Sequence, residues 1–337
     1  MRLRRVNPNG PGLKRIRRGR GFSYVDSDGS RVTDPELLER IQQLVIPPAW
    51  RNVWICERPN GHIQAVGEDA AGRRQYIYHE QWRNDRDEEK FDRMLELAAA
   101  LPDLRAQVHQ DLASRGLTRR RVEAVAIVLL DRGVFRVGGE AYADENGTHG
   151  VSTLLRSHVQ VSGDRIRFDF TAKGGIRHQA EITDHLLATA IRALKRSPST
   201  SERLLMYRHG DEFRELHADD INDRIHELTG CACTAKDFRT WHGTVMAAAA
   251  FAETDRPTSK REMTSTQRRV MEEVAQLLGN TPAIAKGSYV DPRIIRAYEH
   301  GATIERALKR AAQKRSKNAR QSVVDKAVVA TIRSTSA

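Results

Sequence analysis

The sequence is poor in cysteine and contains no long apolar run. Three cysteines occur among 337 residues, which is too few for a disulfide framework. Nowhere do about 18 apolar residues follow one another, so a membrane-spanning helix is not expected. The amino-terminal residues are basic but lack the apolar stretch of a secretory signal. We therefore expect a soluble protein that stays in the reducing environment of the cytoplasm.

The cysteines also do not indicate a metal site. Cys231-Ala-Cys233 lacks the paired CxxC spacing of many zinc ligands, and Cys56 lies far away in the sequence. Cys231 and Cys233 could chelate an ion in principle. Two thiolates without a third or fourth ligand nearby are more often ordinary small side chains. We therefore treat them as structural, and expect neither a disulfide nor a bound metal.

Two further motifs are missing. The chain has no GxxxxGK[ST] loop for a nucleotide and no acidic cluster suited to magnesium. What the chain does have is basic charge, since 56 Lys and Arg residues exceed 44 Asp and Glu residues and give a net charge of +12. Such an excess attracts polyanions, so nucleic acid is the leading partner, although a basic surface can also serve solubility alone.

The length favours two domains, because 337 residues exceed what one compact core usually holds. Residues 1–20 have the composition of a flexible basic arm. A hairpin over residues 22–32 follows, and Asp34-Pro35 predicts the start of a helix to about Leu44. Strands are predicted over 53–56, 62–66 and 73–78. Residues 1–82 should form a small antiparallel sheet domain.

Residues 83–337 are predicted to be mainly helical. Phe91, Met94, Leu95 and Ala98 have the spacing of a buried helical stripe, and Pro102 and Gly116 mark turns. Further helices are predicted over 104–112, 121–130, 184–195, 219–228, 235–251 and 264–278, interrupted by strands over 158–161, 165–170 and 176–182. The tail from Glu305 could be a solvated helix or mobile. The predicted fold class is α+β.

Transfer of a nucleic-acid strand without a metal requires a nucleophile, cations around the pentavalent phosphorus and an acid for the leaving oxygen. Arg136 enters a glycine-rich turn after a buried helix, and its guanidinium suits phosphate oxygens. Such an arginine can equally contact solvent or a helix terminus. Lys173 lies at a hairpin tip beside Gly174 and Gly175 and is a candidate acid, although exposed tips commonly carry lysine.

The other candidates lie in the carboxyl-terminal third. Lys236 and Arg239 share one face of a helix and could reach one phosphate, but their spacing alone favours a surface charge pair on an amphipathic helix. Asn280 and Tyr289 flank a short helix that opens at Thr281-Pro282, which can return both side chains to one cleft. A phenol has a pKa of about 10, so a nucleophilic tyrosine needs neighbouring cations or a water to take its proton. Most tyrosines only bury a ring.

Taken in order, Arg136, Lys173, Lys236-x-x-Arg239 and Asn280-x8-Tyr289 resemble the active site of the poxviral and bacterial type IB DNA topoisomerases. The resemblance covers roughly nine-tenths of the chain. It also includes the stretches Ile46-Pro-Pro-Ala-Trp50, Gln75-Tyr-Ile-Tyr-His79 and Ser288-Tyr-Val-Asp-Pro292.

The resemblance implies a role for each residue. Tyr289 would be the nucleophile, Arg136 and Arg239 would clamp the phosphate, and Lys173 would be the general acid, assisted by Lys236. Asn280 departs from the poxviral pattern, which has histidine there, and is similar to the bacterial one. A neutral amide can still donate to a non-bridging oxygen.

The resemblance also implies the activity and the architecture. The enzyme would relax positive and negative supercoils by cutting one strand of duplex DNA through a 3′-phosphotyrosyl bond, letting the free end rotate and rejoining it. It would need neither ATP nor a metal. The sheet domain and the helical catalytic domain would form a C-shaped clamp around DNA, in a monomeric, cytoplasmic and nucleoid-associated protein.

Two alternatives remain open. A tyrosine recombinase would use the same chemistry. Recombinases, however, look like His-x-x-Arg at the second arginine, where this chain has Lys236-x-x-Arg239, and their amino-terminal half is helical. A non-catalytic DNA-binding protein would use the same cations to hold backbone phosphates, with Tyr289 packing or stacking. Salt-sensitive binding without a covalent adduct would indicate the latter.

Overall fold

The computed structural model describes residues 2–132, 135–140, 143 and 147–336. The contacts within the chain divide it into two compact units, Met1–Glu89 and Lys90–Ala337. This division lies inside a long helix, a little beyond the domain boundary near residue 82 that the sequence suggested.

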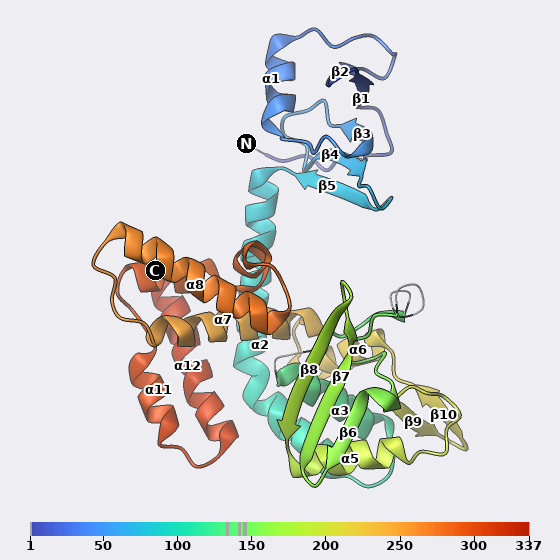
Figure 1. The fold of residues 1–337 in the computed structure, drawn as a ribbon, viewed down its shortest axis with the longest axis vertical. Coiled ribbons are helices and arrows are strands. Elements are labelled where there is room, and N and C mark those ends of the chain that lie inside the picture. The colour runs from blue at the N-terminus through green and yellow to red at the C-terminus, as the bar shows by residue number, and fades with distance from the viewer. Residues whose placement is uncertain (1, 133–134, 141–142, 144–146, 337) are drawn as a thin grey trace. The chain divides into compact units, whose positions relative to one another are not determined.

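The first unit is an antiparallel sheet with one helix (Figure 1). Its strand order is β2-β1-β3-β4-β5. The elements are β1 Leu13–Arg18, β2 Gly21–Val25, α1 Pro35–Gln43, β3 Arg51–Ile55, β4 Ile63–Glu68 and β5 Arg74–Tyr78. Asp34 caps α1 by accepting a hydrogen bond from the Glu36 amide at 3.1 Å, and Pro35 occupies the first helical turn. The helix, β3, β4 and β5 therefore form where their turn and alternation signals predicted them.

The prediction of a flexible arm is wrong for residues 13–18. They form β1, which lies between β2 and β3 in the sheet. Leu13 is buried opposite Ile55, and the strand pairs with neighbours on both sides. The guanidinium of Arg15 donates to the carbonyl oxygens of Ile46, Pro47 and Trp50 at 3.2, 3.0 and 2.8 Å. Backbone pairing and these side-chain bonds outweigh the tendency of a basic segment to stay solvated.

The second unit is mainly helical (Figure 1). Its helices are α2 Glu80–Ala113, which begins in the first unit, α3 Arg119–Asp131, α5 His185–Lys195, α6 Ala218–Thr229, α7 Ala235–Ala252, α8 Lys260–Leu278, α9 Pro282–Ile284, α10 Pro292–Glu299, α11 Glu305–Ala312 and α12 Lys317–Ser336. The central helix is α7, in which 14 of 18 residues are buried. A helix that is buried on nearly every face is enclosed by other elements.

The sequence suggested a turn at Pro102, but Pro102 lies inside α2, a single helix of 34 residues. Proline removes one helical hydrogen bond and crowds the preceding turn. Here Leu97 and Leu101 before it and Leu104 and Val108 after it are all buried in the same core. The burial of apolar side chains on both sides of the proline offsets the free-energy cost of the lost hydrogen bond. Local sequence signals carry no information about this burial.

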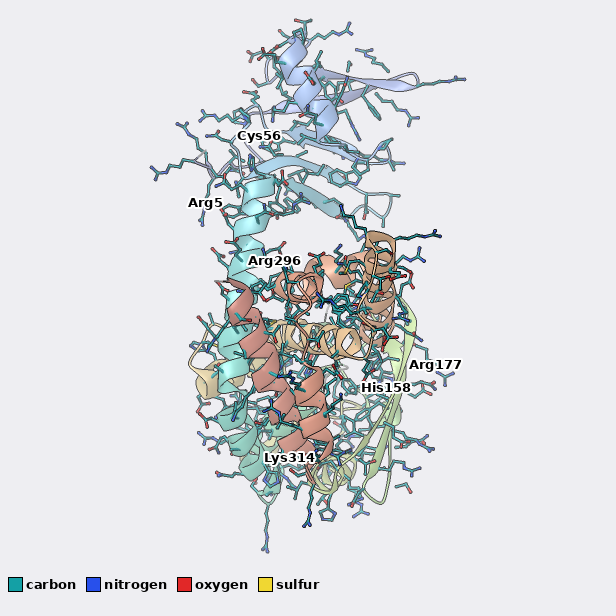
Figure 2. The ribbon with its side chains drawn as sticks, turned by 90° about the vertical axis from the view of Figure 1, so that its left-hand side faces the viewer. Arg5, Cys56, His158, Arg177, Arg296 and Lys314 are labelled. Carbon is teal, nitrogen blue, oxygen red and sulfur yellow. A yellow bond between two sulfur atoms is a disulfide. The ribbon has the colours of Figure 1, made fainter. Side chains whose placement is uncertain are left out.

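Strands β6 Val159–Ser162, β7 Arg165–Ala172 and β8 Ile176–Thr183 form the predicted β insertion as an antiparallel meander. Lys173 lies at the β7–β8 tip, where Gly174 and Gly175 adopt positive φ angles of 83° and 73°. Residues alternate along β8, so Arg177 points away from the sheet and pairs with Asp169 (Figure 2). The residues that alternate with Arg177 along β8, from His178 to Ile182, therefore lie on the inner face of the sheet.

Two features of the second unit were not predicted or were left open. A hairpin of β9 Met206–His209 and β10 Glu212–Glu215 follows α5. The tail from Glu305 forms the helices α11 and α12, with Val328 and Ile332 fully buried. The architecture is the predicted α+β class. Among the described residues, no helix is long and apolar enough to cross a membrane.

Candidate active site

Tyr289 lies beyond the short helix α9, Pro282–Ile284, as expected, and it ends a five-residue π-helical turn, Ala285–Tyr289, that follows this helix. The turn closes through a hydrogen bond from the Val290 amide to the Ala285 carbonyl oxygen at 3.1 Å. The Thr244 hydroxyl fixes its end, donating to the Tyr289 carbonyl oxygen at 3.3 Å and accepting from the Asp291 amide at 3.0 Å. π-helical turns are rare and frequently occur at functional sites.

Gly243 lets the backbone of Tyr289 approach α7 closely. A methyl group added at Gly243 would lie 2.6 Å from the Tyr289 carbonyl oxygen and 3.0 Å from its Cβ atom. Neither atom is the free end of a flexible side chain, so the tyrosine would have to move. Glycine at this position is therefore a requirement of the site, although it weakens a helix interior.

We expect Gly243→Ala to lower the rate of the reaction and to destabilise the fold by about 1–3 kcal/mol, because it forces Tyr289 off α7. Displacements of about 1 Å at a reacting group can cost about 100-fold in rate. Gly287→Ala is the matched control, since an added methyl there meets no atom within 4 Å. Thermal denaturation and single-turnover kinetics would measure both. Equal effects of the two substitutions would contradict this explanation.

Arg136 is held against the loop that precedes Tyr289. Its Nη2 atom donates to Asn280 Oδ1 at 2.9 Å and to the Gly279 carbonyl oxygen at 3.2 Å. Asn280 Nδ2 donates in turn to the Leu278 carbonyl oxygen at 3.2 Å, and the second N–H of that amide is not engaged by a described residue. Arg136 and Asn280, which are 144 positions apart in the sequence, are therefore joined by a side-chain hydrogen bond.

Arg239 is buried, with 4% of its surface exposed, so the surface charge pair that its spacing favoured is wrong. Its Nη2 atom donates to the Leu278 carbonyl oxygen at 2.7 Å, and its guanidinium carbon lies 5.1 Å from the centre of the Tyr289 ring. In the described part of the chain, its Nε atom has no hydrogen-bond partner. Most of α7 is enclosed by other helices, which spacing alone does not reveal.

Within the described ranges, no carboxylate forms an ion pair with Arg136 or Arg239, whereas the buried Arg224 pairs with Asp111 at 2.6 Å. Burial lowers the pKa of Arg239, the charge of Arg136 lowers it further, and Tyr289 opposes both. An uncompensated buried cation is costly. The arrangement is therefore suited to an anion that binds both guanidinium groups.

The pKa of Tyr289 lies below that of an ordinary phenol. Burial acts to raise it, but the charge and hydrogen bonding of Arg239 and the charges of Arg136 and Lys236 outweigh burial. Lys236 is exposed in the first turn of α7, three residues before Arg239. Cations thus stabilise the phenolate, which is the more nucleophilic form of a phenol.

A hollow in the second unit brings Lys173 to the same place, because Arg136, Lys173, Arg239 and Gly279 all line it. The structure therefore gathers Arg136, Lys173 and Arg239 around one cavity, with Asn280 bonded to Arg136 and Tyr289 against Arg239. Lys236 is connected to this group through its charge on Tyr289. Arg136, Lys173, Arg239, Asn280 and Tyr289 therefore form one site.

His178, which was not among the residues predicted from the sequence, also lines this hollow. Its ring lies 5.3 Å from that of Phe135 and 5.1 Å from that of Phe170, and its buried Nε2 atom has no partner among the described residues. Burial lowers its pKa, and the charges of Arg239 and Arg136 lower it further. A signal was present, since β8 alternation places residue 178 on the inner face of the sheet.

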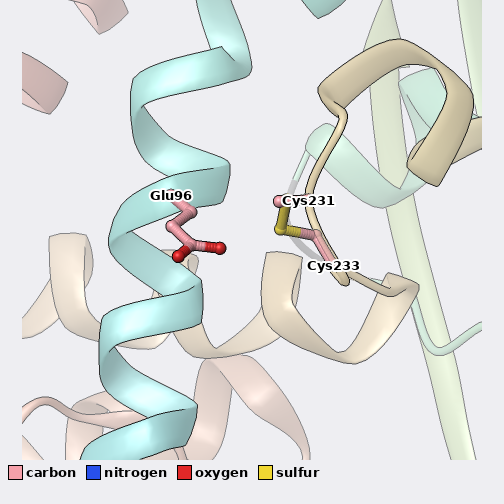
Figure 3. A group of neighbouring side chains, drawn as sticks. All are labelled: Glu96, Cys231 and Cys233. Carbon is pink, nitrogen blue, oxygen red and sulfur yellow. A yellow bond between two sulfur atoms is a disulfide. The ribbon is translucent and has the colours of Figure 1, made fainter.

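The expectation that no disulfide forms is wrong, because Cys231 and Cys233 are joined in the loop between α6 and α7 (Figure 3). Their Cα atoms are 5.2 Å apart, within the range that disulfides span. The assumption that no third ligand lies nearby is also wrong. Glu96 of α2 faces the pair, although it lies far away in the sequence.

Comparison with known proteins gives the family. Residues 79–315 match the catalytic core of eukaryotic DNA topoisomerase I, and residues 21–69 match the amino-terminal domain of bacterial DNA topoisomerase IB. DNA topoisomerase 1B of Acanthamoeba polyphaga mimivirus is 31% identical over 297 residues, covering 86% of this chain and 88% of that protein.

Two further relatives are more distant. DNA topoisomerase 1B of Vaccinia virus (strain Copenhagen) is 24% identical over 291 residues, covering 80% of this chain and 87% of the viral protein. DNA topoisomerase 1 beta of Arabidopsis thaliana is 25% identical over 222 residues, which is 65% of this chain but only 22% of the plant protein. Fold, site and relatives together define a DNA topoisomerase, which is an isomerase. Specifically, the chain belongs to the type IB family, as the resemblance indicated.

Proposed function

We propose that this enzyme relaxes positively and negatively supercoiled duplex DNA by cutting one strand through a covalent bond between Tyr289 and the 3′ phosphate. The observation that carries the proposal is the buried, uncompensated guanidinium of Arg239, with Arg136 beside it and a phenol of lowered pKa against it. A phosphodiester supplies the anion that this pair of arginines lacks.

The Tyr289 oxygen would attack phosphorus and lose its proton to water, while the bond to the 5′ oxygen breaks. The Lys173 ammonium would give a proton to that leaving oxygen, with Lys236 assisting the transfer. Arg136 and Arg239 would bind the non-bridging oxygens, and the free N–H of Asn280 would donate to one of them.

Rotation of the free 5′ end would then release torsion, and the 5′ hydroxyl would attack the phosphotyrosine to rejoin the strand. The phosphotyrosine conserves the energy of the phosphodiester, so the cycle balances without ATP and without a metal. These residue roles follow the resemblance, and the contacts among Arg136, Arg239, Asn280 and Tyr289 support the proposal.

We propose that residues 1–82 form a DNA-binding domain and residues 83–337 a catalytic domain, a boundary seven residues before the one that separates the two compact units. On β5 the exposed rings of Tyr76 and Tyr78 stack at 5.9 Å, and the Arg74 guanidinium lies 5.6 Å from the Tyr76 ring. Exposed aromatic rings next to a cation suit contacts to sugars and base edges. We propose that the enzyme acts as a monomer on duplex DNA at the nucleoid, without a nucleotide.

The test is relaxation of positively and negatively supercoiled plasmids in EDTA without ATP. We expect a ladder of relaxed topoisomers and, on denaturation, protein linked to the 3′ side of the cut. A requirement for magnesium or ATP, or a 5′ linkage, would contradict the proposed mechanism. Salt-sensitive binding that leaves the plasmid supercoiled would instead indicate a non-catalytic DNA-binding protein.

Asn280 gives a prediction about pH dependence. An amide does not titrate, and the lowered pKa of His178 keeps that imidazole neutral near pH 7. We therefore expect single-turnover cleavage by the wild type to show no inflection near pH 6.5, and Asn280→Ala to lower the rate about 100-fold at every pH. Asn280→His should introduce an inflection. A wild-type inflection that disappears in Asn280→Ala would show that the prediction is wrong.

A further inference from the structure

A second group of reactive side chains lies outside the proposed strand-transfer site. Cys231, Cys233 and Glu96 place one ligand atom each within 4.8 Å of one another (Figure 3). Cys233 is buried, Cys231 is half-buried and Glu96 is exposed, so the group is closed on the protein side and open to solvent at the carboxylate. None of these residues has a part in the proposed reaction.

The donor set is suited to a thiophilic divalent cation. Zinc binds thiolate sulfur at about 2.3 Å and carboxylate oxygen at about 2.1 Å, so two such ligands of one tetrahedral ion lie roughly 3.5–3.8 Å apart. The Glu96 carboxylate oxygen lies within 4.8 Å of both sulfur atoms, at most about 1 Å more than that spacing, and a rotation of the exposed Glu96 side chain can close this gap. The two sulfur atoms are bonded to each other and can reach that spacing only after reduction. In the disulfide neither sulfur atom carries the negative charge of a thiolate, so the oxidised pair cannot supply thiolate ligands.

We propose that the reduced pair Cys231 and Cys233 binds a divalent cation such as Zn²⁺ together with Glu96, with water in the fourth position. A dithiol reductant would supply two electrons and two protons to the disulfide and would itself become a disulfide. The cation then displaces the two thiol protons and binds two thiolates. Disulfide and metal are thus alternative states of one site.

The protein holds the two cysteines in position from both ends of their loop. His226 of α6 contacts the Cys231 carbonyl oxygen through Nδ1 at 2.6 Å. On the other side, Thr234 and Asp237 form the capping box that begins α7, and Arg93 of α2 pairs with Asp237 at 3.2 Å. The amino terminus of α7 also favours a thiolate beside it. The ligands are therefore largely preorganised before a cation binds.

Occupation of the site would join α2 to the start of α7, the helix that carries Lys236 and Arg239. A ligand that binds only the folded state stabilises it, so reduced protein should melt at a higher temperature with stoichiometric Zn²⁺ than without it. The site is structural. Relaxation in EDTA would therefore persist, and a failure of the metal proposal would leave the proposed function intact.

The test is titration of reduced, metal-free protein with Co²⁺, which gives near-ultraviolet charge-transfer absorption when bound to thiolates. We expect one Co²⁺ per chain, displaced by Zn²⁺. Glu96→Gln should weaken binding at least about 10-fold, since even partners one shell further from a metal have that effect. Asp103→Asn is the matched control, an exposed carboxylate on the same helix, and should bind as the wild type does.

The thiolates are tested separately. Cys231→Ser should remove most of the absorption, whereas Cys56→Ser, which changes the remaining cysteine, should retain it. Oxidised protein should not bind. Reduced protein without a charge-transfer band, a band that survives in Cys231→Ser, or equal affinities of Glu96→Gln and Asp103→Asn would each overturn the proposal. Relaxation activity and circular dichroism of every variant would show that it has folded.

Discussion

Replacement of Tyr289 by phenylalanine should abolish both plasmid relaxation and the covalent protein–DNA adduct. The substitution removes one oxygen atom and leaves the ring against Arg239, so the site should keep its shape. Without a nucleophile only binding and electrostatic stabilisation remain, and we expect the cleavage rate to fall by more than about 10⁴-fold. Single-turnover cleavage of an end-labelled duplex would measure it.

Tyr298→Phe is the matched control for this experiment. Tyr298 also lies in the second unit, where its hydroxyl contacts Thr254 at 3.0 Å and donates to the Asp255 carbonyl oxygen at 3.3 Å. Its loss should cost about 1 kcal/mol of stability and leave cleavage unchanged. Binding of DNA should persist in both variants. Relaxation by Tyr289→Phe at a rate near that of the wild type would refute Tyr289 as the nucleophile.

The parts of the fold that the sequence predicted are those with strong local signals. Alternation along β7 places Ile166, Phe168 and Phe170 on the buried face, and glycines at the following turn permit its positive φ angles. Asp34-Pro35 predicted the start of α1 for an equally local reason. The failures at Leu13–Arg18 and Pro102 have the opposite origin, since burial against distant residues decided the structure there.

The candidate site also has a part that the sequence could predict and a part that it could not. The order of its motifs along the chain was sufficient to nominate all six residues. Their environment was not predictable, because the burial of Arg239 depends on helices packed around α7, and the close approach of Gly243 to Tyr289 joins segments 46 positions apart. Glu96 beside the cysteines was missed for this reason too. Local patterns identify residue types, whereas desolvation and ligand sets arise from contacts that are distant in sequence.

Arg239 offers the second large prediction, in which activity and stability should change independently. Arg239→Met should lower the cleavage rate by about 10²–10³-fold, the usual effect of removing one donor that stabilises transition-state charge. It should not destabilise the free enzyme. The guanidinium is buried without a carboxylate partner among the described residues, so an apolar side chain of similar volume relieves a desolvation cost.

Arg105→Met is the comparison that makes this result interpretable. Arg105 lies in the second unit and binds Asp131 at 2.8 Å and Asp325 at 2.7 Å. Burial acts to lower its pKa, but these two carboxylates outweigh burial and raise it. Removing the arginine leaves both acids uncompensated, so we expect a loss of about 3–5 kcal/mol in stability. A comparable loss in Arg239→Met would mean that Arg239 is part of the scaffold. An unchanged or higher melting temperature together with slow cleavage would instead mark a cation whose partner is the substrate phosphate.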